Sequence, residues 1–333
     1  MNIYMFPYNN IERSKNKNPY INDLLDSLKA NNVNIINGRK NNKYGIFDLL
    51  IKMTKTDIYY LNFIENTPDR KFGFIQTISL IIILLILKIS GKKILWVIHN
   101  KISHSKNKLL SKIILFYILT NIADKLITHS KEGILFTKSF LKKGKDIKFI
   151  HHPIKNNLFI NNTYSKKNDI LIWGAITPYK GIHSFIDYVI KNKLNDYYNI
   201  LIIGKISDKE LKDKLESIHE RNIIIKNQFI ENEDLEKLFS ETKFVLFTYS
   251  GFSTLSSGAL MDTLSYGAKV IGPNVGAFKD LKEESLIETY NSFDELFKKI
   301  KDPELLTNFN IDKFINDNTW DNFAKKVIQI IKD

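Results

Sequence analysis

Short apolar runs alternate with longer helical stretches along this chain, and this alternation limits the fold more than any other feature. In the first half, the strand candidates MNIYMF, TDIYYLNFI and KKILWVIHN are separated by helical stretches such as INDLLDSLKANN. The pattern restarts in the second half with DILIWGAI, YNILIIG, NIIIKNQFI, KFVLFTYS and AKVIGPN. Strands that alternate with helices form parallel sheets. The sequence therefore predicts the α/β class, with two doubly wound parallel sheets.

The polar stretch INNTYSKKN at residues 160–168 is the best candidate for a linker between two domains. A chain of 333 residues suits two domains of ordinary size. We expect one domain over residues 1–160 and a second over residues 161–315. The last helix, within residues 316–333, has no strand after it and is expected to cross back onto the first domain.

Composition excludes several classes of protein. An apolar content of 44% with 26% charged residues is typical of a folded globular chain. The chain has no cysteine, which excludes a disulfide framework and a thiolate metal site. No signal peptide is visible over Met1–Pro7, so the cytoplasm is the expected compartment.

Positive charge is concentrated in the first half. The net charge of the whole chain is +13; residues 1–160 hold 26 Lys and Arg against 10 Asp and Glu, whereas residues 161–333 hold 23 against 26. A basic half is typical of a surface that meets a polyanion, either nucleic acid or an anionic lipid layer. The alternative is a genomic bias toward lysine, although that bias would not spare the second half.

The run Ile78–Leu87 is apolar throughout but too short to cross a bilayer, which takes about 20 residues. It is read either as a helix buried against the sheet or as an apolar surface that dips into a bilayer interface. One helix can do both on different faces. The interfacial reading is supported by nearby basic residues, namely Lys101, Lys106, Lys108 and Lys112.

The segment STLSSGALMDTL predicts an anion site. It places Ser256, Ser257 and Gly258 at the start of a helix that follows a strand, and a helix start exposes backbone N–H groups suited to a diphosphate. Asp262, one turn further on, suits ribose hydroxyls. The alternative for the two serines is ordinary helix capping. A second loop, WGAITPYKGIHSF, brings Lys180 to a helix start after Gly174, where its ammonium suits a phosphate.

Histidines follow several predicted strands of the first half. His99 comes at the carboxyl end of a strand, where open α/β sheets bind ligands, and is expected to hydrogen-bond a substrate hydroxyl or to act as an acid or base. His104 and His129 have weaker claims to a role. The pair His151–His152 has no carboxylate at metal-ligand spacing, so we expect no metal site.

Taken together, these segments resemble the GT-B nucleotide-sugar glycosyltransferases, specifically the retaining enzymes of glycosyltransferase family 4. GAITPYKG is similar to the family's strand-G-x-x-x-x-x-K-G segment, and STLSSGALMDTLSYGAKVIGPNVGAF to its E-x7-E segment. LWVIHNKISH resembles the strand whose histidine lies beside the sugar, and TWDNFAKKVIQII the helix that returns to the first domain. The resemblance covers nearly the whole chain and implies two Rossmann-like domains facing a central cleft, with the acceptor on the first domain and the donor on the second.

The chain departs from the family pattern at three positions. The first glutamate of the pair is replaced by Thr254, and the second is shortened to Asp262. The family's arginine after the strand glycine is Ala175, which leaves Lys180 as the expected basic contact. These changes resemble a subgroup of polysaccharide-building enzymes with Ser-Ser-Gly in place of the acidic loop, and they leave retention of configuration open.

The motifs and the resemblance together assign the site residues. Expected catalytic residues are His99 and Lys180. Expected donor-binding residues are Gly174, Lys180, Gly204, Phe229, Ile230, Thr254, Ser256, Ser257, Gly258 and Asp262. Expected acceptor-binding residues are Tyr8, Asn9, Asn10 and His104. No metal and no cofactor is expected, because no D-x-D triplet stands where a diphosphate-bound ion would need it.

The sequence therefore indicates a glycosyltransferase that moves a sugar from a UDP- or GDP-sugar to a lipid-linked oligosaccharide in capsule, exopolysaccharide or O-antigen assembly. It would work at the cytoplasmic face of the inner membrane, with its basic half on the anionic lipid surface. One alternative is an epimerase of the same fold, which would need added carboxylates near the sugar. Another is a phosphorylase, normally much longer. A third is a basic nucleic-acid-binding protein, although no aromatic-interleaved basic patch or recognition motif is visible.

Overall fold

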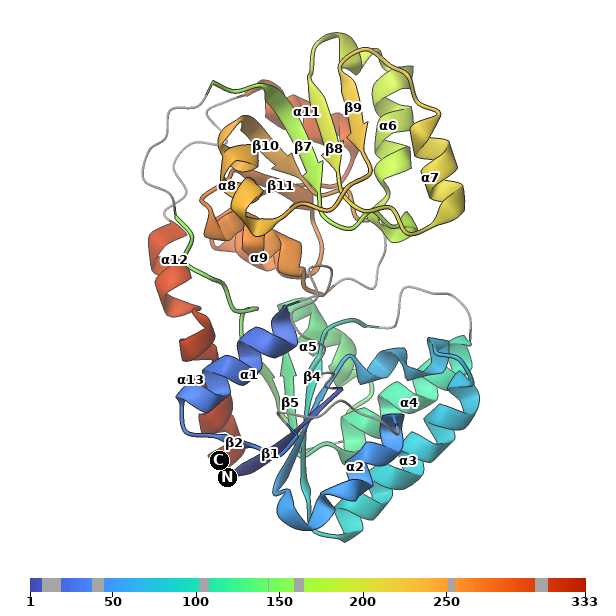
Figure 1. Cartoon of the computed structure of the whole chain (residues 1–333), viewed down its shortest axis with the longest axis vertical. Coiled ribbons are helices and arrows are strands. Elements are labelled where there is room, and N and C mark those ends of the chain that lie inside the picture. The colour runs from blue at the N-terminus through green and yellow to red at the C-terminus, as the bar shows by residue number, and fades with distance from the viewer. Residues whose placement is uncertain are drawn as a thin grey trace. The chain divides into compact units, whose positions relative to one another are not determined.

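The computed structural model describes residues 1–7, 19–37, 45–101, 108–142, 144–158, 165–250, 255–302 and 311–333. By its internal contacts the chain divides into two compact units (Figure 1). The N-terminal unit comprises Met1–Pro153, Ser253–Ser256 and Asn318–Asp333. The C-terminal unit comprises Ile154–Phe252 and Ser257–Asp317.

The N-terminal unit is built on a parallel sheet with the strand order β2-β1-β3-β4-β5-β6 over its described residues. Its strands are β1 Asn2–Phe6, β2 Asn34–Ile35, β3 Ile58–Asn62, β4 Lys93–Ile98, β5 Lys125–Thr128 and β6 Ile147–Phe149. The central strands are buried on both faces, which is why they read as continuous apolar runs in the sequence. The strand order reverses at β1, so the topological switch point of this sheet lies between β1 and β3.

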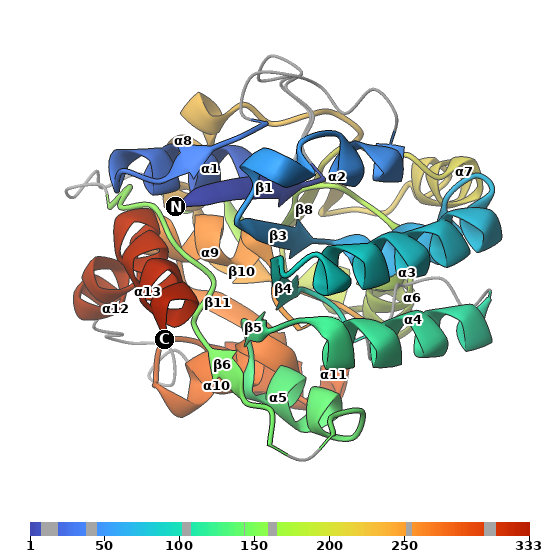
Figure 2. The same ribbon diagram turned by 90° about the horizontal axis from the view of Figure 1, so that it is seen from below.

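Helices cover both faces of this sheet. One face carries α2 Asp48–Ile51, α3 Gly73–Ile89, α4 Leu109–Ile122 and α5 Lys131–Lys138, and the other carries α1 Tyr20–Ala30 and α13 Trp320–Lys332. Short 3-10 turns occur at η1 Gly45–Phe47, η2 Met53–Lys55 and η3 Ile64–Asp69. Figure 2 shows α3 and α4 running side by side, and the two helices are in contact.

The last helix packs on the N-terminal unit. Thr319 caps α13 by accepting a hydrogen bond from the Asn322 amide at 3.2 Å. Phe323, Val327 and Ile331 recur every four residues and are buried in the same core as α1. A side-chain hydrogen bond of 2.7 Å joins Asn31 to Asp321. The preceding helix, α12 Ile311–Asp317, packs in the C-terminal unit instead.

The C-terminal unit is built on a second parallel sheet, ordered β12-β11-β10-β7-β8-β9 over the described residues. Its strands are β7 Asn168–Trp173, β8 Ile200–Ile203, β9 Ile223–Lys226, β10 Thr242–Leu246, β11 Val270–Pro273 and β12 Glu288–Tyr290. One face is covered by α8 Asn232–Ser240, α9 Gly258–Ser265, α10 Gly276–Glu283 and α12. The other is covered by α6 Ile182–Lys191, α7 Lys209–Glu216 and α11 Phe293–Lys301, with the turns η4 Pro178–Lys180 and η5 Leu194–Asp196.

The division between the units comes earlier than residue 160. Ile154 is buried in the core of the C-terminal unit, and the Asn157 amide donates to the Ser265 carbonyl at 3.2 Å. Residues 154–158 therefore already belong to the C-terminal unit, although their sequence is too polar to predict a strand or helix.

Among the described residues, each helix is too short or too polar to cross a lipid bilayer.

Candidate functional site

The most unusual charged group of the C-terminal unit is the ammonium of Lys180. Lys180 ends the short turn η4 after β7, is only 6% exposed, and makes no ion pair with a described residue. The Tyr249 ring lies beside it, with its centroid 5.7 Å from Nζ. Burial lowers the pKa of Lys180 to about 8. A buried cation without a carboxylate partner is costly, and an anionic ligand would remove that cost.

Two other elements come close to this ammonium. Gly174 follows β7 with a φ of +86°, and a side chain built there would lie 3.5 Å from Lys180 Nζ and 3.9 Å from Cβ of Ala259. Ala259 is in the first turn of α9. The structure thus brings together the end of β7, the lysine of η4 and the start of α9, which the sequence analysis assigned to one diphosphate site.

Ser257 is the N-cap of α9. Its hydroxyl accepts a hydrogen bond from the Leu260 amide at 3.3 Å and shares another of 2.9 Å with the Tyr249 hydroxyl. The capping role is therefore real, and the Tyr249 contact ties the start of α9 to the ring beside Lys180. A side chain at Gly258 would meet open space. Asp262 lies half-buried in the next turn of α9.

Gly204 has a packing role that the sequence did not reveal. It follows β8, and a Cβ at this position would lie 1.8 Å from the Gly174 carbonyl oxygen. The space over Gly204 is therefore filled by the loop that carries Gly174 and Ala175. Gly204 would therefore affect a donor site indirectly, by allowing this loop to take its position.

Phe229 and Ile230 follow β9 at the edge of the sheet. Phe229 is 44% exposed, whereas Ile230 is partly buried against the core beneath α8 and α9. The exposed ring is free to stack on a nucleobase, which is compatible with the donor-binding role expected of Phe229.

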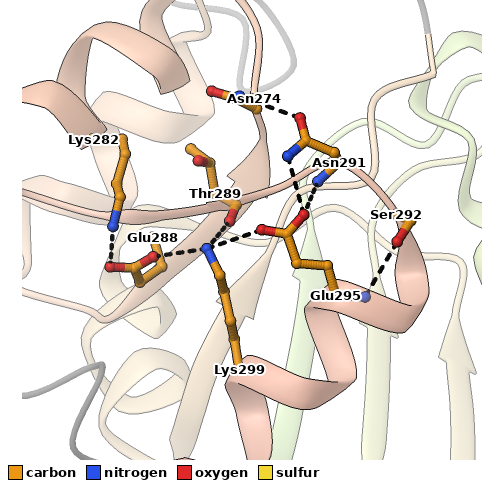
Figure 3. A network of polar contacts seen from close by, with 8 residues as sticks. All are labelled: Asn274, Lys282, Glu288, Thr289, Asn291, Ser292, Glu295 and Lys299. Atoms are coloured by element: carbon orange, nitrogen blue, oxygen red, sulfur yellow. Dashed lines mark hydrogen bonds and ion pairs between the residues drawn. The ribbon is translucent and has the colours of Figure 1, made fainter.

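Polar groups next to β11 and β12 are already engaged with one another (Figure 3). Lys282 and Lys299 both pair with the buried carboxylate of Glu288, the second at 3.2 Å. Glu295 accepts two hydrogen bonds from Asn291, from its backbone amide at 2.9 Å and its side-chain amide at 3.0 Å. These side chains satisfy each other, so this network leaves no unmatched charge for a ligand.

In the N-terminal unit, His99 directly follows β4 and is buried. Its Nε2 lies 3.1 Å from Oδ1 of Asn62, and its ring stacks on Phe63 with centroids 3.9 Å apart. Burial, and then the neighbouring His129 and His152, hold the pKa of His99 well below its usual range. His99 is therefore a neutral imidazole at pH 7. If Nε2 donates to Asn62, Nδ1 keeps a lone pair that can accept a hydroxyl proton.

Three further aromatic residues surround His99. Tyr20 packs edge-on against it with ring centroids 4.8 Å apart, and the Tyr20 hydroxyl lies 3.0 Å from Nε2 of His129. Nδ1 of His129 donates to the Ile150 carbonyl at 2.9 Å, so Nε2 accepts the Tyr20 proton. Burial lowers the pKa of His129 to about 3 and that of His152 to about 4. These residues, Tyr20, His99, His129 and His152, form what we call the histidine cluster.

One buried carboxyl group of the N-terminal unit belongs to no motif that the sequence suggested. Glu65 lies in η3, just after β3, and is 3% exposed; its Oε2 accepts no hydrogen bond from the described residues. Its Oε1 makes a long contact of 3.5 Å with Asn100 Nδ2, and the Trp96 side chain and the Arg70 charge partly offset the effect of burial on this carboxyl. Burial raises the pKa of Glu65 to about 7, which is suited to proton transfer near neutral pH. The available signal was its position, since Glu65 follows a buried strand as His99 does.

Several predicted site residues lie outside the described part of the chain: Tyr8, Asn9, Asn10, His104 and Thr254. Ser256 is described and half-buried, but its contacts assign it to the N-terminal unit, whereas Ser257 belongs to the C-terminal unit. Over the described residues, no group of three or more His, Asp or Glu side chains could hold a metal ion. Metal independence stays a prediction.

No family model and no curated protein matches this sequence. Solved structures do match it over its whole length. HepE from Anabaena, in complex with UDP and glucose, has a TM-score of 0.65 at 12% identity, covering 100% of this chain and 99% of that chain. An α-glucosyltransferase in complex with UDP and a 13-mer DNA containing an HMU base has a TM-score of 0.64 at 14% identity, with 100% of both chains covered.

A third match is the lipopolysaccharide outer core galactosyltransferase WaaB in its apo form. Its TM-score is 0.65 at 15% identity, and 99% of each chain is covered. At such low identity the likeness shows the fold. The prediction of two doubly wound parallel sheets is confirmed, and the chain has the α/β fold of the GT-B glycosyltransferases.

Proposed function

We propose that this protein is a glycosyltransferase that takes a sugar from a UDP- or GDP-sugar. The observation that carries the proposal is the buried ammonium of Lys180, which lacks a carboxylate partner among the described residues and lies beside Gly174 and the first turn of α9. A diphosphate supplies the missing negative charge. The solved structures with UDP or UDP-glucose support the same ligand class.

The chemistry required of this site is mainly electrostatic. The bond between the anomeric carbon of the sugar and the diphosphate oxygen breaks, and negative charge develops on the departing nucleotide. Lys180 and the amides of α9 stabilise that charge. The acceptor hydroxyl forms the new bond to the anomeric carbon and gives its proton to the departing phosphate oxygen. Attack from the same face as departure gives retention, which is the outcome we propose.

His99 would hold the sugar rather than protonate it. The pKa of His99 lies well below its usual range, so its ring is neutral at pH 7 and cannot act as an acid. A neutral imidazole can still form a hydrogen bond with a sugar hydroxyl. His99→Ala is accordingly expected to lower turnover more than donor affinity. The acceptor-side roles of Tyr8, Asn9, Asn10 and His104 belong to the same proposal.

The acceptor we propose is a lipid-linked oligosaccharide at the cytoplasmic face of the inner membrane, as in the assembly of a surface polysaccharide. The support is the concentration of positive charge in residues 1–160. One matching structure contains DNA, so a nucleic-acid acceptor is the alternative that the experiment must exclude. An epimerase differs from both because it needs no acceptor.

Nucleotide release from UDP-, GDP- and ADP-sugars, measured with and without a membrane extract, tests the proposal. We expect release from one donor class, dependent on the extract and reduced about 10- to 100-fold in Lys180→Met, because a charge-assisted phosphate contact is lost. Lys191→Met, an exposed lysine at the end of α6, is the matched control. Equal release by Lys180→Met would refute the assigned site, and sugar conversion without an acceptor would favour an epimerase.

A further inference from the structure

Two neighbouring helices of the N-terminal unit present large apolar side chains to solvent. On α3, Ile75 is 64% exposed; on α4, Leu110 is 71% exposed. We call this surface the α3–α4 face, and it consists of Phe72, Phe74, Ile75, Ile78, Ile82, Leu85, Ile86, Ile89, Leu109, Leu110, Ile114 and Tyr117. Figure 2 shows the two helices lying next to each other, and their contact makes the face continuous.

This face is additional to the side on which the helices pack. Leu80, Ile83, Leu84 and Leu87 of α3, with Leu115, Phe116 and Leu119 of α4, are buried against the sheet. Each helix is thus apolar on its inner and outer sides. A surface helix of a globular protein normally has a polar outer side, and a large exposed apolar patch marks an interaction site.

Positive charges outnumber negative charges around this face. Residues 70–123, which contain both helices, include nine Lys or Arg and no Asp or Glu. Lys71, Lys93 and Lys108 are exposed. Two others are neutralised from outside the segment, because Lys112 pairs with Asp69 at 2.8 Å and Lys88 with Asp124 at 2.5 Å. The apolar face therefore has a positive rim.

We propose that the α3–α4 face inserts into the interface of an anionic lipid bilayer, with the lysines at the level of the phosphates. An apolar centre with a basic rim matches the acyl and headgroup layers of such a membrane. A second copy of the chain would bring like charges together, because a self-complementary contact needs opposite charges on the same patch. Nucleic acid would match the lysines but not the aliphatic centre.

The direction of the helices places the membrane near the substrate edge of this unit. Each helix runs back from the carboxyl end of its preceding strand, so the helix starts, with Phe72 and Leu110, lie toward the edge where His99 lies. The link between this membrane contact and a lipid-linked acceptor rests on the proposed function. The membrane contact itself rests on the exposed face alone.

Vesicle flotation tests the contact without donor or acceptor. We expect wild-type protein to float with vesicles of 30% phosphatidylglycerol in phosphatidylcholine, at least tenfold more than with pure phosphatidylcholine, and to be released partly by 500 mM salt. The double variant Ile75→Glu, Leu110→Glu should lose at least tenfold of this binding. Tyr197→Glu, at a residue 78% exposed in the C-terminal unit, adds a charge away from the face and should bind as wild type.

Several outcomes would overturn the inference. They are absence of wild-type binding to anionic vesicles, equal binding by the double variant, or light scattering that shows a dimer which the double variant dissociates. If DNA at the same concentration of negative charge displaced the protein from anionic vesicles, and the double variant bound DNA as well as wild type does, the surface would be one for nucleic acid instead. The two proposals are tested separately by the thermal shift that a donor produces. A double variant that loses vesicle binding should keep this shift, whereas failure of the glycosyltransferase proposal would remove the shift from both proteins.

Discussion

At the scale of single residues, each unit contains a buried ionisable group whose charged form would be more stable in water. Lys180 is buried with its charge unmatched by any described carboxylate, and Glu65 is buried with an oxygen that accepts no hydrogen bond from the described residues. Natural folds keep such costly groups where function requires them, so both are candidates for contact with substrate. Each makes its own prediction about pH.

Donor affinity should fall as the pH rises through the pKa of Lys180. The ammonium form binds the diphosphate, and in the free protein its pKa is about 8. Affinity for the UDP- or GDP-sugar is therefore constant below pH 7 and about tenfold weaker at pH 9. Titration calorimetry across this range measures the effect. In Lys180→Met the residual affinity should not change with pH, and a flat profile for the wild type would contradict the assignment.

Glu65→Gln should stabilise the protein above pH 7 but not at pH 5. The folded pKa of about 7 lies above the value of 4.5 for an unperturbed glutamate, so the folded state binds the extra proton between these values. The contribution of Glu65 to the free energy of unfolding is therefore fully present below pH 4.5. It is lost as the pH rises to 7, and the loss is up to about 3 kcal/mol.

Urea unfolding of wild type and Glu65→Gln at pH 8 and pH 5 measures this change. All other titrating groups are common to both proteins, so they cancel in the difference between the two unfolding free energies. An equal difference in unfolding free energy at the two values would show that Glu65 is not the titrating group.

At the scale of elements, most strands were predictable because buried parallel strands are continuous apolar runs, as in DILIWGAI for β7 and KKILWVIHN for β4. The strand β12 was missed. It is three residues long and contains Glu288, whose burial depends on Lys282 and Lys299 from two separate helices. No pattern within β12 itself carries that information.

The loop after β7 depends on its neighbour across the sheet. Gly204→Ala should push a methyl group against the Gly174 carbonyl and displace the loop that leads to Lys180, because the two atoms would be 1.8 Å apart. We expect destabilisation of about 1–3 kcal/mol and weaker donor binding. Gly258→Ala is the matched control for stability alone, since its Cβ meets open space and the fold should tolerate it, whereas its donor binding is expected to change because Gly258 is itself an expected donor-binding residue. Thermal unfolding without donor compares the stability of the two variants; equal destabilisation of both would contradict this packing account.

The two motifs of the proposed diphosphate site are visible in the sequence because each contains its own signal, a lysine and glycine after a strand and a capped helix start. The isolation of Lys180 could not be predicted, since it depends on Tyr249 and Ala259 from distant parts of the chain. The same holds for Glu65, which is buried beside residues that follow other strands. Tertiary packing, rather than local sequence, fixes the electrostatics.

At the scale of the whole molecule, acid should unfold the N-terminal unit first. His99, His129 and His152 are neutral in the fold, with pKa values held below 6.5 by burial and by one another. Stability is fully present above pH 6.5 and is lost as pH falls toward 4, at up to about 1.4 kcal/mol per pH unit for each histidine. The C-terminal unit has no such cluster among its described residues.

Trp96 and Trp320 lie in the N-terminal unit and Trp173 in the C-terminal unit, so fluorescence in a Trp173→Phe background can follow this loss during urea unfolding between pH 7.5 and pH 5. His129→Gln should reduce the pH dependence by about a quarter, because burial also lowers the pKa of His151 to about 4, and the exposed His219→Gln should leave it unchanged. A wild-type stability that is constant over this range would refute the account of a neutral, buried cluster.

The central claim is that the unmatched ammonium of Lys180 binds the diphosphate of a nucleotide-sugar. The most direct measurement is the melting temperature of wild type and Lys180→Met with UDP, GDP, ADP and their sugars. A ligand at 100 times its Kd stabilises the folded state by about 2.7 kcal/mol, which raises the melting temperature by several degrees. We predict that one nucleotide class does so in the wild type and fails in Lys180→Met, whose own melting temperature without ligand is higher. Equal shifts in the two proteins, or no shift in either, would contradict the claim.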